Sequence, residues 1–461
     1  SLIMVAVTAV GFFLPFLLRS QVYTLPEYLE RRYDRRSRVY FSALTIFLNI
    51  VVDTAGTLYG GAIMLKLILP QWPLWEIVAV LALSAGIYTV AGGLRAVIYT
   101  ETVQAVILLG ASVFIAYFAF DKAGAVDWYL RTGEPFDKAG GWNAVMAAVD
   151  PSKLSLIRPI DDPGVPWLGL VLGVPLLGFY FWCTNQFMVQ RVLSAKDENH
   201  GRWGALFAGL LKLPVLYVMV LPGTAAILLY PQLDKPDLVY PTLIFDLLPA
   251  GLIGVVIAGF FAAIMSSIAS TFNSAATLVT MYFVKPRVPG ASNATLVRAG
   301  RITTIVFMVL AVAWAPQIER FESLWQYLQA VLAYAVPPVC ALFLIGLFWR
   351  GANAQGAFAS IVAGLFGGAA LFYSNVMAPE PLGLHFLYVA PILFVLSAVV
   401  LMAVSAATAP PSMAQVGALL WTPAFYRDET RQLAGLPWWQ NYRVLSVLLL
   451  VLTAVIVWTF R

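Results

Sequence analysis

The stretch AGFFAAIMSSIASTFNSAATLVTMY, residues 258–282, sets a regular series of hydroxyl side chains in an apolar background. Ser266, Ser270 and Ser274 recur every four residues, so a helix would align their hydroxyls along one face. In a membrane-spanning helix this face would be a line of oxygen atoms at membrane depth. The pattern leaves two interpretations open: close helix packing, which small hydroxyl residues favour, and an ion site.

The composition of the whole chain predicts a membrane protein. Of its 461 residues, 61% are hydrophobic and 11% are charged, whereas soluble domains average about 45–50% and about 25%. We therefore expect an all-α, polytopic fold with a single integral domain over residues 1–461. Cys183 and Cys340 both lie in apolar segments, so no disulfide framework is expected. With only two histidines, a histidine-based metal or haem site is not expected either.

The hydrophobic segments predict about twelve membrane spans, because a spanning helix needs about 20 apolar residues. They are expected at 2–18, 39–68, 74–91, 102–119, 165–189, 203–230, 251–283, 298–317, 323–348, 355–373, 386–407 and 442–460. Loops on one side carry most of the Lys and Arg, which predicts that loop 19–38 is cytoplasmic. Since Ser1 opens directly in an apolar run with no recognisable signal peptide, we expect a fragment that lacks its true N-terminus.

Three of the expected spans contain helix-breaking residues. The fifth contains GVPLLG at 173–178, the sixth Pro214 and Pro222, and the ninth Pro337 and Pro338. Proline removes a backbone donor and clashes with the preceding turn, so these helices should kink or break. Several broken helices near the midplane are typical of a transporter binding site, although each kink alone could serve packing.

A few polar residues within the spans are candidates for chemistry. Lys212 lies nine residues into its span, about 13 Å deep, and an intramembrane charge suggests function unless it is paired for structure. Asp53 is mid-span, where it could face a polar interior or form a salt bridge. Glu101 opens the fourth span, where a carboxylate also suits a helix N-terminus.

Aromatic and amide side chains gather in two further places. The segment FYFWCTNQ, residues 179–186, could stack rings on a ligand and read hydroxyls with its amides, or it could belong to an interfacial aromatic belt. Trp325 and Gln329 are four apart and share a helical face. A buried glutamine needs partners for its donors and acceptor, which a polyhydroxylated substrate would supply.

The sequence gives little support for catalysis. It contains no nucleotide-binding P-loop motif, no H-E-x-x-H zinc motif and no cysteine pair at metal spacing. An intramembrane enzyme would also need a nucleophile and base at a plausible spacing, and none is found. We therefore expect a protein that is not an enzyme.

Several stretches together resemble the sodium/solute symporter family, and within it the sodium/glucose cotransporter branch. The matching stretches follow the order of the family over nearly the whole chain: YTLPEYLERRY (23–33), AGGLRAVIYTETVQ (91–104), WCTNQFMVQRVLSAK (182–196), LLKLPVLYVMVLPG (210–223), AAIMSSIASTFNSAATLVTM (262–281) and LIGLFWR (344–350). This resemblance implies an inverted-repeat fold of the leucine-transporter type with alternating access around a midplane site. It also implies that two family helices precede the first span and are missing here. Residues 1–351 would then form a truncated transport core and 352–461 peripheral C-terminal helices.

The resemblance also implies residue roles in binding sodium. The Ala263 carbonyl and the Ser266 and Ser267 hydroxyls match one half of the family's sodium site. Glu101 stands where the family more often has an aspartate, and it could still couple to sodium. Ala269 replaces a hydroxyl found in two-sodium members, so we expect one sodium per substrate.

A second set of matches concerns the substrate. The residues that match contacts or neighbours of the sugar are Lys212, Gln329, Trp182, Phe181, Trp325, Gly178 and Ser1. Two of them depart from the family: Phe181 replaces a tyrosine and so lacks its hydroxyl, and Gly178 replaces a polar residue. The identity of the substrate is therefore left open.

Together these expectations describe a sodium-coupled symporter for a sugar or polyol, with sodium, a small solute and the lipid bilayer as partners and no nucleic acid. We expect a multi-pass protein of the plasma (inner) membrane. One alternative is a symporter for a monocarboxylate, sialic acid, amino acid or vitamin, because Lys212 could pair with a carboxylate. A non-transporting sensor or channel-like member is a further alternative.

Overall fold

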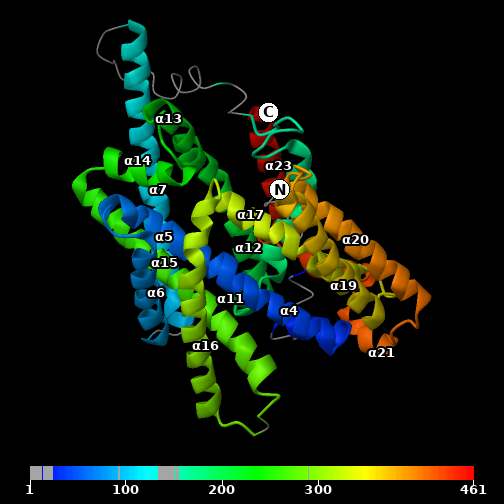
Figure 1. Cartoon of the computed structure of the whole chain (residues 1–461). Helices are drawn as coiled ribbons and strands as arrows, with labels where there is room; N and C mark the ends of the chain where they lie inside the picture. The colour runs from blue at the N-terminus through cyan, green and yellow to red at the C-terminus, as the bar shows by residue number, and fades with distance from the viewer. Residues whose placement is uncertain are drawn as a thin grey trace. The chain divides into compact units, whose positions relative to one another are not determined.

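The computed structural model describes residues 13, 24–91, 94–132, 150, 155–288 and 290–460, and the named elements among them are all helices (Figure 1). Nine helices in this part of the chain are long and apolar enough to cross a membrane, and one bent pair adds a tenth. A shorter apolar helix lies at Leu74–Ile87. Each expected span from residue 39 onward coincides with one of these helices, which confirms the helical, polytopic prediction. The expected span 2–18 lies outside the described residues.

The chain divides into two compact units that are each built from separate parts of the sequence. The first comprises Ser1–Thr45, Leu156–Lys212 and Gln329–Arg461, and the second Ile46–Ser155 and Leu213–Leu328. Three helices have residues in both units: α4 (Arg35–Leu48), α12 (Glu198–Val215) and α17 (Leu324–Ala335).

In the second unit, α15 (Ala250–Val279) packs against α6 (Leu74–Ala91), α7 (Leu94–Thr132) and α16 (Asn293–Trp314) (Figure 1). A Cβ built on Gly259 of α15 would lie 2.8 Å from Ile107 of α7, so glycine allows these helices their close approach. The other elements of this unit are η2 (Asn49–Thr54), α5 (Ala55–Ile68), η4 (Leu216–Val220), α13 (Leu221–Leu229), η5 (Pro236–Leu238), α14 (Val239–Leu247), η6 (Thr280–Val284) and η7 (Ala315–Arg320).

In the first unit, α20 (Phe386–Ala407) lies beside α19 (Ala354–Phe372) (Figure 1). It also packs on α10 (Trp167–Phe179) and α18 (Pro337–Phe348). The other elements of this unit are α3 (Leu25–Arg32), η3 (Tyr180–Thr184), α11 (Gln186–Leu193), η8 (Tyr373–Met377), α21 (Met413–Val416), η9 (Gly417–Leu419), α22 (Pro423–Leu433) and α23 (Tyr442–Thr459).

Two of the three expected helix interruptions lie where the prolines predict them, and the third lies further along its span. The ninth span is bent by 55° where α17 meets α18, next to Pro337. The sixth span changes to a π-helical segment at Leu216–Val220, between Pro214 and Pro222. In the fifth, α10 continues through Pro175, and the π-helical segment follows at Tyr180–Thr184, after GVPLLG rather than within it. Proline deletes one backbone donor, and a wider turn is one way for a helix to absorb that loss.

The YLERRY motif is explained by a buried guanidinium. Arg32 has 0% exposed surface and donates to the carbonyls of Gly346, Trp349 and Ala352 at 2.7, 2.9 and 2.7 Å. The Gly346 carbonyl lies in the last turn of α18 and the other two follow it, in a region where carbonyls lack internal donors and the helix dipole favours a cation. Arg32 therefore fastens α3 to the end of α18.

A buried ionic cluster connects the C-terminal helices to α12. Glu429 of α22 has 1% of its surface exposed and pairs with Arg202 of α12. It also accepts from Arg443 Nη2 at 2.7 Å and from Tyr442 Oη at 2.6 Å. Breaking a buried pair by removing one partner leaves an uncompensated charge and is strongly destabilising, so this cluster fixes α22 and α23 to the first turns of α12.

Candidate functional site: a polar layer between α7 and α15

The hydroxyl of Ser266 meets a buried amide from another helix. Ser266 is 1% exposed and Gln104 of α7 is 8% exposed, and Ser266 Oγ lies 3.0 Å from Gln104 Oε1. The same Oγ lies 3.1 Å from the Ala263 carbonyl. One hydroxyl has one proton, so it donates to only one of these oxygens at a time. Oxygens of Ala263, Ser266 and Gln104 are thus concentrated in a small buried volume.

Ser266, Ser270 and Ser274 form a hydroxyl stripe along α15, and one turn after Ser266 this stripe contacts a carboxylate. Ser270 is fully buried, and its hydroxyl donates to Glu101 Oε1 at 3.4 Å. Glu101 and Gln104 are three residues apart on α7, so they share a helical face. The structure therefore brings the predicted Glu101 next to the same face of α15 as the predicted Ser266.

Ser267, beside the stripe, and Ser274, its last member, differ in burial and in hydrogen bonding. Ser267 is half-buried, and its carbonyl accepts from Thr271 Oγ1 at 3.0 Å. Ser274 is fully buried, and its hydroxyl has no hydrogen-bond partner among the described residues. The polar layer thus includes residues 263–270 and ends before Ser274.

The chemistry of this layer suits a hard monovalent cation. Carbonyl, hydroxyl and amide oxygens are ligands for hard ions, as in calcium sites, but here a single carboxylate accompanies them. Among the described residues no group of three His, Cys, Asp or Glu side chains could hold a metal ion. When Ser266 donates its proton to Gln104, its lone pairs remain available to a cation.

Gln104 was not among the site residues predicted from the sequence, although its spacing from Glu101 points to it. It lies one helical turn after Glu101, on the face that Glu101 was already expected to present to the ion site. A search for polar residues at i and i+3 from each candidate would have found it. Its importance is that it orients the Ser266 hydroxyl, as outer-shell groups orient metal ligands.

In the first unit, three substrate candidates lie around one irregular helix segment. Gly178 is buried near the end of α10, and Phe181 and Trp182 are half-buried within the π-helical segment that follows. The two rings meet edge to face with centroids 6.3 Å apart, and Phe187 adds a second edge-to-face contact to Phe181 at 5.9 Å. A π-helical segment frequently marks a functional position in a helix.

The neighbouring amides hold the backbone. Asn185 Oδ1 accepts from the Phe187 N–H at 3.2 Å and caps α11. Gln186 Oε1 accepts from the Leu25 N–H at 3.1 Å and fixes the start of α3. Both side chains are buried and each oxygen serves a backbone donor, so these two amides hold the starts of α11 and α3.

The other substrate candidates lie on two interrupted helices. Lys212 is exposed in the last turn of α12. Trp325 is 43% exposed and Gln329 is half-buried, and they lie one turn apart on α17 as their spacing predicts. The remaining candidate, Ser1, lies outside the described residues.

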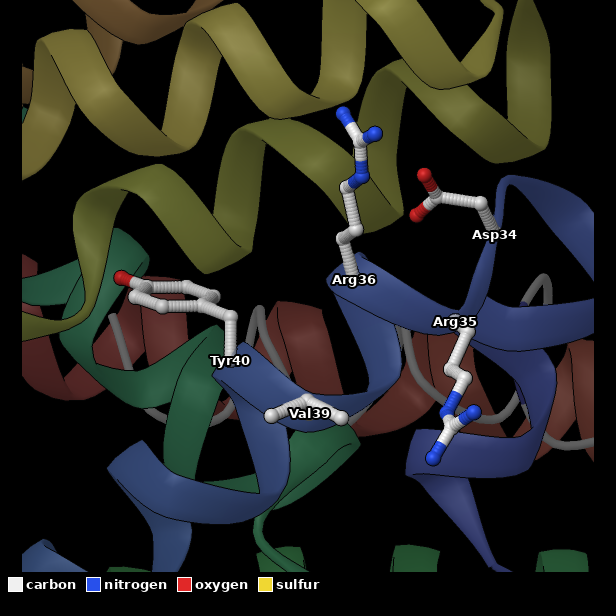
Figure 2. A pocket seen from close by; sticks show the side chains of 5 residues that line it. All are labelled: Asp34, Arg35, Arg36, Val39 and Tyr40. Carbon is white, nitrogen blue, oxygen red and sulfur yellow. The ribbon is translucent and has the colours of Figure 1, made fainter.

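The structure also contains a surface hollow away from these candidates. It has a volume of about 570 Å³ and is lined by Asp34, Arg35, Arg36, Val39 and Tyr40. Figure 2 shows the side chains of Arg35 and Arg36 pointing away from each other, so they do not converge on one anion. Arg36 instead lies over the Phe358 ring, 5.0 Å from its centroid.

Comparison with known proteins identifies the family. The model of the sodium:solute symporter family matches residues 1–364. A sodium/mannose cotransporter of Bos taurus is 32% identical over 89% of this chain and 74% of its own length. Sodium/glucose cotransporter 1 of Oryctolagus cuniculus is 32% identical over 93% of this chain and 70% of its own length.

A solved structure confirms the expected transporter fold. The substrate-bound, outward-open structure of a Na+-coupled sialic acid symporter has a TM-score of 0.70 to this chain, with 89% of this chain and 84% of that chain covered. The two are 20% identical, so this likeness concerns the fold. The family match over residues 1–364 and the cotransporter relatives show that the chain belongs to the sodium:solute symporter family.

Proposed function

We propose that the protein is a sodium-coupled secondary transporter that moves a sugar or polyol by alternating access, and that it is not an enzyme. The observation that carries the proposal is the buried oxygen cluster of Ser266, Ala263 and Gln104 between α15 and α7. Its members are neutral, so a sodium ion held there would bind weakly enough to be released. The cotransporters of mannose and glucose among its relatives support the choice of substrate class.

The proposed sodium ligands are the Ala263 carbonyl and the Ser266 and Ser267 hydroxyls, with Glu101 coupling to the ion from α7. Ser270 links this carboxylate to the stripe. Ala269 offers no side-chain oxygen at the position where two-sodium members of the branch carry a hydroxyl. We therefore expect one sodium ion per substrate molecule.

The proposed substrate residues are grouped by chemistry. Aromatic faces of Phe181, Trp182 and Trp325 would stack on the apolar faces of a sugar ring, and Lys212 and Gln329 would hydrogen-bond its hydroxyls. Gly178 would leave room beside them, and Ser1 is retained from the resemblance. This substrate assignment is independent of the sodium assignment, so the first can be wrong while the second is right.

Transport would draw on the sodium gradient. Each elementary charge that crosses the membrane potential gains about 2.3 kcal/mol per 100 mV. Sodium would favour the outward-open state and substrate would permit closure, each through its differential affinity for the two states. The distribution of Lys and Arg supports the plasma (inner) membrane with loop 19–38 in the cytoplasm. Residues 1–461 would act as one transport domain, with 352–461 peripheral to it.

A second candidate function is sodium symport of a carboxylate-bearing solute such as a monocarboxylate or sialic acid. The observation that favours it is the exposed Lys212 ammonium, which could pair with a carboxylate. The loss of a hydroxyl at Phe181 also weakens the specific match to sugar transporters. Both candidates share the sodium site and differ only in the solute.

Uptake into proteoliposomes containing the full-length protein tests this proposal. We expect sodium-dependent counterflow of labelled glucose, inhibited by unlabelled glucose, galactose or inositol and not by carboxylates, with a sodium Hill coefficient near one. Inhibition only by carboxylates would select the second candidate. Equal counterflow in sodium and choline would refute sodium coupling, and a Hill coefficient near two with matching flux ratios would refute the single-sodium site.

A further inference from the structure

The first turn of α17 receives a carboxylate from a distant loop. The loop between α13 and α14 carries Asp237 within the short helix η5, and both of its carboxylate oxygens face the Leu324 N–H, at 3.1 and 2.9 Å. Leu324 is the first residue of α17, and its N–H is one of the donors that a helix cannot satisfy internally. A carboxylate at this position also interacts favourably with the helix dipole.

A second contact of the same loop reinforces the first. Lys235 Nζ donates to the Glu319 carbonyl of η7 at 3.0 Å, just before α17 begins. Burial raises the pKa of Asp237 above its usual range, while the Leu324 N–H and Lys235 act in the opposite direction. The carboxylate therefore bears a desolvation cost at this position, and its contacts to the helix N-terminus and to Lys235 offset only part of that cost.

The next turn of α17 is held from other sides. Tyr327 Oη donates to the Val51 carbonyl at 2.7 Å and accepts from Trp314 Nε1 at 2.6 Å. On α5, a Cβ built on Gly56 would lie 2.9 Å from Leu328 Cδ2. The first turn has contacts besides the loop: the same Cβ would lie 3.5 Å from Leu324 Cδ1, and Ser323 Oγ accepts from the Gln326 N–H at 3.2 Å. Asp237 therefore adds a cap from the loop to a helix start that also contacts α5 and Ser323.

We propose that Asp237 is a positioning residue for transport, which caps α17 from the loop between α13 and α14 and thereby holds Trp325 in place. Trp325 is the residue directly after the capped Leu324, so fraying of the first turn would displace it before any other candidate. The inference rests on the proposed function, because it takes Trp325 as a substrate residue. The bend of 55° at the other end of α17 makes this helix a separate half of its span.

Three variants in the full-length protein separate capping from charge and from general stability. Asp237→Ala removes the acceptor, whereas Asp237→Asn keeps one and asparagine is an equally good capping residue. Asp234→Ala is the matched control, because Asp234 is an exposed carboxylate in the same loop. We expect Asp237→Ala to raise the apparent KM for the sugar about five-fold with little change in maximal rate, the size expected for a lost cap. The other two variants should stay within about two-fold of the unmodified protein.

A measurement that does not require transport completes the test. With Gln326→Cys as a reporter, chosen because Gln326 is a half-buried residue in the first turn of α17, the labelling rate by a membrane-impermeant thiol reagent reports exposure of the α17 start, and the native Cys183 and Cys340 are buried. Asp237→Ala should raise this rate several-fold, and Asp237→Asn should not. Unchanged labelling and unchanged KM in Asp237→Ala would overturn the inference. An absence of sodium-dependent uptake by the unmodified protein would instead refute the proposed function, and the labelling result would still decide whether Asp237 caps α17.

Discussion

The two ends of the hydroxyl stripe on α15 have the same sequence pattern and different surroundings. At its N-terminal end, Ser266 and Ser270 face Gln104 and Glu101 of α7. At its C-terminal end, Ser274 is equally buried, but its hydroxyl has no hydrogen-bond partner among the described residues. The contrast teaches that a stripe of small polar residues becomes a candidate ion site only where a second helix contributes oxygens. Without such a helix, the same residues only allow close packing.

The largest effect should come from the proposed ligands. Ser266→Ala and Ser267→Ala each remove an oxygen from the ion, and hydrogen-bond-strength contacts to a charge are worth about 1.5–3 kcal/mol. We expect the sodium concentration for half-maximal uptake to rise at least about ten-fold, with the sugar KM at saturating sodium much less affected. Measuring uptake against sodium concentration checks this, and equal effects of Ser267→Ala and Ser274→Ala would reject the assignment of the ligands.

An intermediate effect is expected at Gln104. In Gln104→Ala, the Ser266 hydroxyl can donate only to the Ala263 carbonyl. Its lone pairs would then no longer be oriented toward the cation. Because a typical hydrogen bond contributes about 0.5–1.5 kcal/mol, the sodium requirement should rise roughly three- to ten-fold. Gln104→Glu keeps an acceptor for Ser266 and should restore most of the affinity. If both variants behave like the unmodified protein, the amide has no orienting role and the contrast between the two ends of the stripe weakens.

The smallest effect should come from Ser274. Its hydroxyl makes no hydrogen bond to the described residues that would stabilise the folded protein or orient an ion ligand. Ser274→Ala should therefore change the sodium requirement by less than about two-fold and leave the thermal unfolding midpoint unchanged or slightly higher. Sodium titration of uptake and thermal unfolding in detergent measure the two quantities. A ten-fold loss of sodium affinity would mean that the polar layer extends further along α15 than the described contacts indicate.

Much of the fold was predictable because its signals are local. Spans follow from hydrophobic length, and the irregular sixth and ninth spans follow from Pro214, Pro222 and Pro337, whose missing N–H acts on the turn that contains it. Likewise, the shared faces of Ser266 and Ser270, of Trp325 and Gln329, and of Glu101 and its neighbours follow from helical periodicity. The family resemblance was carried by motifs that are continuous in the sequence, and it is confirmed.

Only the tertiary structure decided which polar groups meet. Ser266 and Gln104 are separated by 162 residues, and Leu324 and Asp237 by 87, so no local pattern pairs them. The structure also assigned the Asn185 and Gln186 oxygens to backbone caps, where the sequence suggested that they could read hydroxyls. The sequence by itself determined the helices, their faces and the residues on them, because these depend on neighbours within a turn or two. Which helical faces pack together depends on segments that are distant in the sequence. The contacts of Ser266 and Ser270 with α7 distinguish them from Ser274, whose hydroxyl has no partner in the described part of the chain.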